Sequence, residues 1–211
     1  MTPAIRETIS TALTLLVFSV LGAGLLSGAF TLTRPTIELS EQAEKLKLVA
    51  QTLPAGSFDN DLIRDARKLP ANAQLGLKRD GLAYVARQQG IATAVVLEAI
   101  APDGYAGEIR LLIGIRADGR IAGVRVTAHK ETPGLGDYID IARNPWIGQF
   151  TGKSLSAPRD EAWKVRKDGG EFDYLAGATI TPRAVVKAVR KALHYFEANR
   201  AELLAAEIPH V

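Results

Sequence analysis

The chain has 211 residues, a formal net charge of +3 and no cysteine. The missing thiols exclude disulfides, thiol catalysis and iron–sulfur clusters held by the chain's own side chains. We expect no metal site, because His129, His194 and His210 lie far apart and outside any metal-binding spacing. Lysine and arginine never form a run of five, so no nucleic-acid partner is expected. Redox work by this chain would therefore need a bound organic cofactor.

An apolar segment near the N-terminus is the first predicted element. Residues 9–32 carry no charged side chain and are long enough for one membrane-spanning helix. A cleaved signal peptide is the competing interpretation. However, the apolar run is longer than is usual for a signal peptide, and Arg6 is the only basic side chain before it. We therefore predict an uncleaved anchor over residues 1–33. The GxxxG spacing of Gly24 and Gly28 fits close packing with partner membrane helices and fits ordinary membrane-helix composition equally well.

The next region, residues 34–80, is predicted as a helical linker. Its hydrophobic spacing favours a helix over residues 35–53 that leads off the anchor. Pro54 and Gly56 end that helix. A further short helix is suggested for Asp61–Leu69, just before Pro70.

Residues 81–211 have the pattern of an α+β domain. Strands are predicted at 82–88 and 92–100 around Gln89-Gly90, and at 108–116 and 120–128 around Asp118-Gly119. Residues 123–127 alternate between apolar and polar side chains, so one face of that strand is expected to meet water. Short helical segments are suggested around 138–142 and 146–150. The last helix is predicted from Pro182 to about 206, with a buried stripe of Val185, Val186, Val189, Leu193 and Phe196. Strands followed by helices without βαβ alternation indicate α+β.

The segment 173–182, DYLAGATITP, is the first chemical motif. Thr181 suits a helix N-cap and Pro182 suits the first helical position. The small residues 176–178 allow another group to approach the backbone, and Thr179 places a hydroxyl beside the positive end of the helix. A phosphate would be stabilised there by free backbone amides. An ordinary helix cap without a ligand explains the same residues.

The segment 129–137, HKETPGLGD, is the second motif and follows the second hairpin. Pro133 and the two glycines fix a turn that allows a planar ligand to approach the backbone. A plain surface loop also fits this motif when it is considered alone. His129 is expected to be an ordinary loop residue, and Trp146 and Trp163 are expected to be core aromatics rather than groups that stack on a planar ligand.

The two motifs together resemble the FMN-binding domain family. ETPGLG at 131–136 and GATIT at 177–181 carry that resemblance, and AGATITPRAVVKAV at 176–189 is similar to the G subunits of Rnf electron-transport complexes. A single N-terminal span also fits those subunits. The resemblance implies that FMN is joined through a phosphoester to the threonine after Gly-Ala, which is Thr179 here. A separate flavin transferase, which uses FAD and magnesium, performs the attachment in that family, because a threonine hydroxyl without a base is a poor nucleophile.

The resemblance also implies a set of cofactor-binding residues. The phosphate is expected near Thr179, and the ring is expected near the turn at 131–136. Ala176 departs from the Ser or Thr that is frequent there, so the phosphate would depend more on backbone amides. No side chain is expected to act as a catalytic acid or base. The candidate residues besides Thr179 are Asp173, Leu175, Ala176, Gly177, Ala178, Ile180, Thr181, Glu131, Thr132, Gly134 and Leu135.

By the same resemblance, the chain is a flavin-carrying subunit of a complex that couples electron flow between NADH and ferredoxin to ion translocation. Its partners would be the other subunits and the flavin transferase. It would lie in the bacterial inner membrane as a single-pass protein with a periplasmic domain. Arg34, Lys45 and Lys47 after the span favour a cytoplasmic domain instead when charge alone is considered. Two alternatives are the C subunit of the sodium-pumping NADH:quinone reductase and a membrane-anchored scaffold or sensor without flavin.

Overall fold

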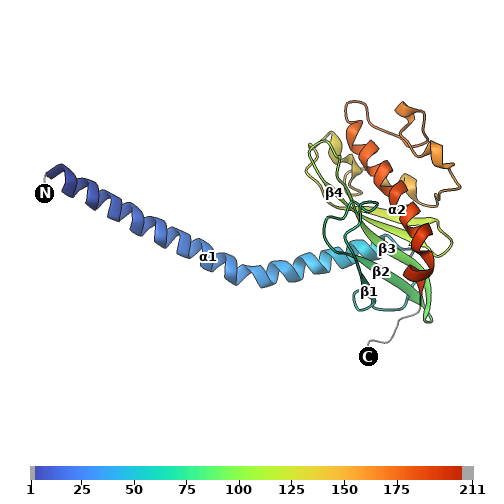
Figure 1. Cartoon of the computed structure of the whole chain (residues 1–211), viewed down its shortest axis with the longest axis horizontal. Coiled ribbons are helices and arrows are strands. Elements are labelled where there is room, and N and C mark those ends of the chain that lie inside the picture. The colour runs from blue at the N-terminus through green and yellow to red at the C-terminus, as the bar shows by residue number, and fades with distance from the viewer. Residues whose placement is uncertain (1–2, 206–211) are drawn as a thin grey trace. The chain divides into compact units, whose positions relative to one another are not determined.

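The computed structural model describes residues 3–205, and the chain divides into two compact units, Met1–Glu44 and Lys45–Val211. Helix α1, Pro3–Gln51, begins in the first unit and ends in the second. The second unit contains a five-stranded antiparallel sheet and the C-terminal helix α2, Ile180–Leu204 (Figure 1). The α+β class predicted from the sequence is therefore confirmed. The predicted end of the last helix at residue 206 lies outside the described residues.

The apolar segment of the first unit lies entirely in α1. Within Ile5–Pro35, the most apolar stretch of 18 residues has a mean hydropathy of 2.1, and none of it is buried. Within residues 3–205, this is the one segment that is long and apolar enough to cross a bilayer. The hydroxyls of Thr31 and Thr33 donate to carbonyls one turn earlier, which satisfies them within the helix. The sequence suggested a second helix from residue 35, but Pro35 lies inside the continuous α1.

The sheet is a simple meander of strands in chain order. Its strands are β1 Ala66–Leu69, β2 Gly81–Gln88, β3 Ile91–Ala101, β4 Ile109–Arg116 and β5 Ile121–Ala128. Each pairs antiparallel with the next in the order β1-β2-β3-β4-β5. The two predicted hairpins are confirmed. Gln89 and Gly90 both have positive φ, at 52° and 80°, as a tight turn of the primed type requires.

Strand β1 replaces the short helix suggested for Asp61–Leu69. The Asp61 carboxylate accepts hydrogen bonds from the backbone N–H groups of Ile63 and Arg64, and a turn forms over residues 62–65. The chain then pairs with β2, with Ala66 opposite Tyr84 and Leu69 opposite Gly81. The helix prediction was wrong because a local side-chain turn competes with helix formation and the partner strand supplies the backbone hydrogen bonds.

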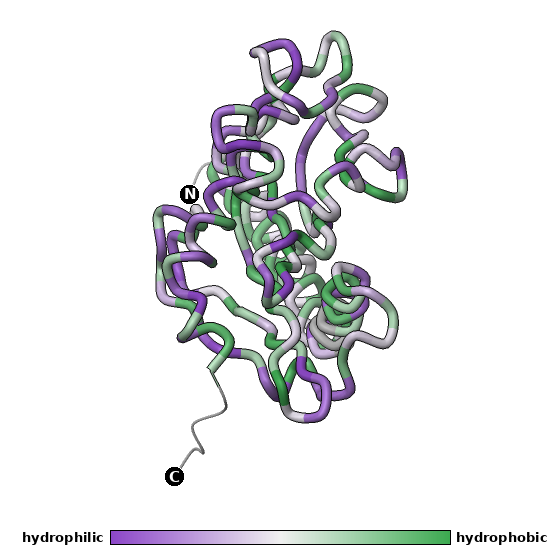
Figure 2. The backbone as a smooth tube through the Cα atoms, turned by 90° about the vertical axis from the view of Figure 1, so that its right-hand side faces the viewer, coloured by the Kyte–Doolittle hydropathy of each residue, from purple (hydrophilic) through white to green (hydrophobic). Residues whose placement is uncertain are grey.

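Both faces of the sheet are covered. On one face, α2 and four short 3-10 helices enclose the larger core. These helices are η1 Gly136–Ile139, η2 Pro145–Phe150, η3 Asp160–Ala162 and η4 Arg166–Asp168. On the other face, Val49 and Leu53 join Leu62 in a smaller cluster with alternate residues of β2, β3 and β4. Figure 2 shows hydrophobic segments through the middle of this unit and hydrophilic segments mainly in its peripheral loops.

The second cluster corrects the expectation of a wet face on β5 at Gly123, which is buried, whereas Arg125 is half-buried and Thr127 is exposed as expected. Gly123 lies directly opposite Gly114 in the sheet. A Cβ added at Gly123 would stand 2.9 Å from the Thr52 carbonyl oxygen, and one at Gly114 would stand 2.7 Å from it. Thr52 is 1% exposed. The alternation of polar and apolar residues in β5 was misleading because glycine counts as polar by pattern, whereas here it makes room for a covering backbone.

Helix α2 packs its predicted stripe onto the sheet. All five stripe residues are at most 1% exposed. At the far end of the helix, Arg67 donates to the carbonyl oxygens of Glu202 and Ala205, at 2.8 and 2.7 Å, and Arg87 also donates to Ala205 at 2.7 Å. The Glu202 carbonyl also accepts from the Ala205 amide at 3.3 Å, so the guanidinium groups add to the hydrogen bonding at the negative end of the helix. The start of α2 carries the candidate site.

Candidate functional site

Thr179 stands at the entrance of α2. The helix begins at Ile180, so Thr179 is its N-cap, with φ −81° and ψ −26°. Its side chain makes no capping hydrogen bond, and the residue is half-buried. The sequence predicted Thr181 as the cap. That prediction is wrong, because Thr181 lies in the first turn and is 1% exposed.

The loop before Thr179 is held by groups from outside the motif. The Asp173 carbonyl accepts a 2.7 Å hydrogen bond from Trp146 Nε1, and the Asp173 amide donates to Gln149 Oε1 at 2.8 Å. Gly177 has φ +90°, a conformation that side-chain-bearing residues rarely adopt. The loop therefore has a defined path into the helix, and its small residues leave the backbone around Gly177 accessible.

Tyr138 connects this loop to the second motif. Its hydroxyl accepts a hydrogen bond from the Leu175 amide at 3.2 Å and donates to the Ala178 carbonyl at 3.5 Å. Burial raises the pKa of the Tyr138 hydroxyl above its ordinary value of 10.0. The neutral hydroxyl can therefore both donate and accept at neutral pH, as this bridge requires.

An aromatic cluster lies beneath the same loop. Tyr138 meets Trp146 edge to face at 5.4 Å between ring centroids, and Trp146 meets Phe150 at 5.6 Å. Phe172, next to the loop, stacks 4.9 Å from Phe150 and lies 4.8 Å from Trp163. Both tryptophans are core aromatics, as the sequence suggested.

The turn of the second motif is closed by its own backbone. The Leu135 and Gly136 amides donate to the Thr132 carbonyl at 3.1 and 3.0 Å. The Gly134 amide donates to Asp137 Oδ1 at 2.8 Å, and Gly134 has φ +77°. Thr132, Gly134 and Leu135 are exposed. The turn thus presents a fixed backbone and a few side chains to solvent.

Glu131 joins the two motifs directly. Its Oε2 accepts a 2.5 Å hydrogen bond from the Thr181 hydroxyl, across 50 positions of sequence. Its Oε1 accepts from the Ala106 amide at 3.1 Å, in the loop between β3 and β4. Glu131 is 4% exposed, so its carboxylate has almost no free surface for a ligand. The backbone amide of Glu131 donates to His129 Nδ1 at 3.1 Å, which makes His129 part of the loop's support.

Exposed apolar side chains surround the motifs. Leu135, Leu175 and Ile180 are 47%, 45% and 47% exposed, and Tyr174 is 37% exposed. They come from both motifs and from the first residue of α2. Large apolar side chains exposed in two motifs that contact each other are typical of a binding surface. A flat apolar ring laid against them would remove them from water.

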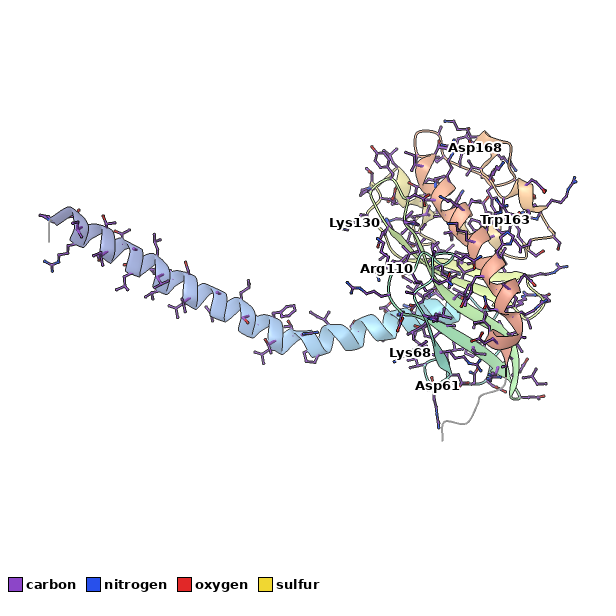
Figure 3. The ribbon with its side chains drawn as sticks, viewed as in Figure 1. Asp61, Lys68, Arg110, Lys130, Trp163 and Asp168 are labelled. Atoms are coloured by element: carbon purple, nitrogen blue, oxygen red, sulfur yellow. The ribbon has the colours of Figure 1, made fainter. Side chains whose placement is uncertain are left out.

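A groove of about 690 Å³ runs along the outward side of α2, between the helix and residues 163–168. Figure 3 labels Trp163 and Asp168 on that side of the helix. Its walls hold several basic side chains, of which Arg183 pairs with Asp168 through two hydrogen bonds of 2.6 Å. That arginine holds the pKa of the exposed Asp168 carboxyl below its ordinary value. Neither motif lines this groove.

The structure brings most predicted site residues together around the start of α2. Ile180 and Thr181 form the first helical turn, where backbone amides have no intrahelical acceptor. Asp173 is exposed and pairs with Arg166 at 3.1 Å rather than pointing to a buried partner. Sequence reasoning missed the contributions of Ala106, Tyr138 and Gln149. Among the described residues, no group of three or more histidine and acidic side chains is suited to a metal ion.

Comparisons with known proteins agree with this geometry. The FMN-binding domain model matches residues 104–194, and the RnfG N-terminal region model matches residues 1–52. The G subunit of the ion-translocating oxidoreductase complex of Pseudomonas aeruginosa is 50% identical over 202 residues, which cover 96% of this chain and 94% of that protein. The corresponding protein of Vibrio cholerae is 44% identical, covering 96% and 95%, and that of Shewanella baltica is 43% identical, covering 90% of each. The chain belongs to the family of ion-translocating oxidoreductase complex G subunits and contains its FMN-binding domain.

Proposed function

We propose that this chain is a flavin-carrying electron-transfer subunit of a membrane complex, with FMN joined through its phosphate to the Thr179 hydroxyl. The observation that carries the proposal is the contact between the motifs. Glu131 and Thr181 hold the ETPGLG turn against the first turn of α2, while the Thr179 hydroxyl makes no capping bond. The family membership supports the cofactor, and the uncapped hydroxyl supports the attachment atom.

The phosphate would be held mainly by backbone. The amides at Ile180 and Thr181 are free of intrahelical partners, and the helix dipole favours an anion at that end. Gly177 and Ala178 leave space beside the hydroxyl. Ala176 supplies no hydroxyl, which increases the dependence on the amides. Asp173 pairs with Arg166 and so holds the start of the loop. It would not contact the phosphate, because a carboxylate repels a phosphate.

The flavin ring would lie on the exposed apolar residues. Leu135, Leu175 and Ile180 each have nearly half of their surface in water, and Thr132 and Gly134 offer polar and backbone contacts at the same place. FMN, when bound, supplies the redox chemistry, and these residues orient it and exclude water from one side. A covalent bond suits so open a surface, because retention then does not depend on an enclosing pocket.

The complex proposed for the chain couples electron flow between NADH and ferredoxin to ion translocation. The apolar segment of α1 would anchor the chain in the bacterial inner membrane as a single span, with the flavin domain in the periplasm. Its partners would be the other subunits of the complex and a flavin transferase that attaches FMN from FAD. The family resemblance supports the periplasmic side over the charge distribution around the span.

The attachment is tested by making the full chain together with a flavin transferase. A fluorescent band in a denaturing gel and the mass of the Thr179 peptide should show FMN added with loss of water. Thr179→Ala should abolish the adduct while leaving the fold intact, because this hydroxyl makes no capping bond. Thr127→Ala, which removes an exposed threonine hydroxyl outside both motifs, is the control and should load normally.

Two results would contradict the proposal. A wild-type chain without added mass would favour the alternative of a scaffold or sensor that keeps the fold without flavin. Full loading of Thr179→Ala would move the attachment elsewhere. Orientation needs a separate measurement, in which a compartment-sensitive reporter is fused to the C-terminus. Reporter activity in the cytoplasm would overturn the periplasmic placement.

A further inference from the structure

Two threonine hydroxyls stand two positions apart at the start of α2. Successive residues of an α-helix are rotated by about 100°, so Thr179 and Thr181 lie on nearly opposite sides of the helix axis. Thr179 is half-buried and uncapped, whereas Thr181 is 1% exposed. A transferase that must choose between them would meet very different surroundings at each hydroxyl.

The surroundings of Thr181 are built around the Glu131 carboxylate. Oε2 accepts a 2.5 Å hydrogen bond from the Thr181 hydroxyl, and Oε1 accepts one from the Ala106 amide at 3.1 Å. A buried carboxylate is costly unless its oxygens are hydrogen-bonded, and such charge-assisted bonds are strong. The pair therefore fixes the rotation of the first helical turn relative to the ETPGLG turn.

Two glycines close the space around this carboxylate. A Cβ at Gly136 would stand 2.8 Å from Glu131 Oε2 and 3.0 Å from Thr181 Oγ1. A Cβ at Gly104 would stand 2.8 Å from Glu131 Oε1. Backbone from two separate loops and the hydroxyl of Thr181 thus pack directly around one carboxylate.

We propose that Glu131 is a positioning residue that selects the attachment site. It sequesters the Thr181 hydroxyl and holds the first turn of α2 so that Thr179 alone is presented to the transferase. This inference rests on the proposed function. In the transfer, the bond from the FMN phosphorus to Thr179 Oγ forms as the phosphoanhydride bond of FAD breaks; AMP leaves with the bridging oxygen, and the hydroxyl proton is released.

Glu131→Gln tests the role at nearly constant volume. In this variant the amide oxygen can accept from the Ala106 amide while the amide nitrogen donates to the Thr181 hydroxyl, so a neutral hydrogen bond replaces the charge-assisted one. We expect flavin attachment at Thr179 to slow about tenfold or more, as the loss of a charge-assisted hydrogen bond predicts. We also expect part of the adduct to appear on Thr181, because its hydroxyl is held less strongly. Peptide mass spectrometry after a timed reaction with FAD, magnesium and the transferase measures both.

Other variants separate positioning from stability. Thr181→Ser keeps the donor and should load Thr179 at nearly the wild-type rate. Thr181→Val should slow attachment as Glu131→Gln does, and the double variant should be no slower than either, because both act on the same contact. Glu98→Gln is the matched control. Its carboxylate also accepts from a backbone amide, that of Leu82, and from a hydroxyl, that of Tyr84, but on the opposite face of the sheet.

A second readout does not need flavin. In the flavin-free chain, Glu131→Gln should speed amide hydrogen exchange in the peptide that covers residues 177–186, and Glu98→Gln should not. If flavin is attached to Thr179 of the Glu131→Gln variant at the wild-type rate, with no adduct on Thr181, the site-selection role is overturned. Unchanged exchange would overturn the positioning contact. A wild-type chain that takes up no flavin would instead contradict the proposed function, and the exchange measurement would still decide whether Glu131 holds the helix start.

Discussion

The two faces of the sheet differ in how completely the segments that cover them bury their apolar side chains. On the face that packs against Val49 and Leu53, the covering is closed, and Thr52 sits so tightly over Gly114 and Gly123 that neither position can hold a Cβ without displacing it. On the α2 face, the buried aromatic cluster is covered by loops that leave large apolar side chains exposed to water. The comparison shows that one sheet can combine a fully packed face with a face whose covering loops leave large apolar side chains exposed.

The largest expected effect on stability comes from a substitution in the aromatic cluster. Phe172→Ala should lower the free energy of unfolding by about 3–5 kcal/mol, because Phe172 is fully buried and contacts both Phe150 and Trp163. Urea denaturation of the full chain in detergent, followed by tryptophan fluorescence, measures the loss. Phe58→Ala, which truncates a half-buried ring beside the other cluster, is the control and should cost less. Equal losses would mean that the two faces do not differ as described.

The closed face is tested at Gly114. Gly114→Ala should cost about 1–3 kcal/mol, because its Cβ would stand 2.7 Å from a backbone oxygen of Thr52 that cannot move without shifting the chain. Flavin attachment to the folded protein should be unchanged. Gly148→Ala is the control, since a Cβ there meets no atom within 4 Å. A Gly114 variant as stable as wild type would show that the covering segment adapts easily.

Tyr138→Phe should have an intermediate effect. The variant removes the acceptor of the Leu175 amide and the donor to the Ala178 carbonyl, at a cost of about 1 kcal/mol. Hydrogen exchange over residues 174–179 should become faster. Tyr84→Phe removes a comparable hydroxyl on the closed face, where Tyr84 donates to Glu98, and should leave exchange in that loop unchanged. The same increase in both variants would point to general loosening.

The smallest effect is expected at Asp160, beside α2. The hydrogen bond from Arg190 holds the pKa of the Asp160 carboxyl below its ordinary value of 3.8. A depressed folded-state pKa stabilises the fold above pH 3.8, and this contribution disappears as pH falls through the lower folded-state value. The side chain is 36% exposed, so solvent screening limits the contribution to roughly a few tenths of a kcal/mol.

Asp160→Asn should therefore be slightly less stable than wild type at neutral pH and should approach wild type as the pH falls below 3.8. Urea unfolding at neutral pH and below pH 3.8 measures the difference. Asp80→Asn, at an exposed carboxyl, gives the background effect of removing a charge. A stability difference that grows on acidification would contradict the sign of this prediction.

Local chemistry made much of the fold predictable. The Asp118-Gly119 and Gln89-Gly90 turns indicated both hairpins, and the stripe of α2 indicated its buried side. The covering of the second face was not predictable, because it depends on glycines that approach the backbone at Thr52. The strand at Ala66–Leu69 was missed because its hydrogen bonds come from β2, and no local pattern records that partner.

In the candidate site, too, local features could be predicted from the sequence, whereas contacts with distant residues could not. Thr179 and the two motifs could be identified from their residues and their resemblance to a family. The role of Thr181 could not, since Thr before Pro suggests a cap by local rules, whereas its hydroxyl is used by Glu131 on a distant loop. Ala106 and Tyr138 carry no sequence signal for their contacts, because one uses its backbone amide and the other a hydroxyl that many core tyrosines possess.

The chain order of the meander has a consequence for when the site can exist. Each strand pairs with its neighbour in sequence, so the sheet can assemble progressively from short-range contacts. The Thr179 loop and the first turn of α2 belong to the last part of the chain, and they contact Tyr138 and Glu131, which lie 37 and 50 positions earlier in the sequence. We therefore expect a truncated or partly folded chain to offer no well-formed attachment site. Loading with flavin would then mark a chain that has been made to its end and has completed its fold.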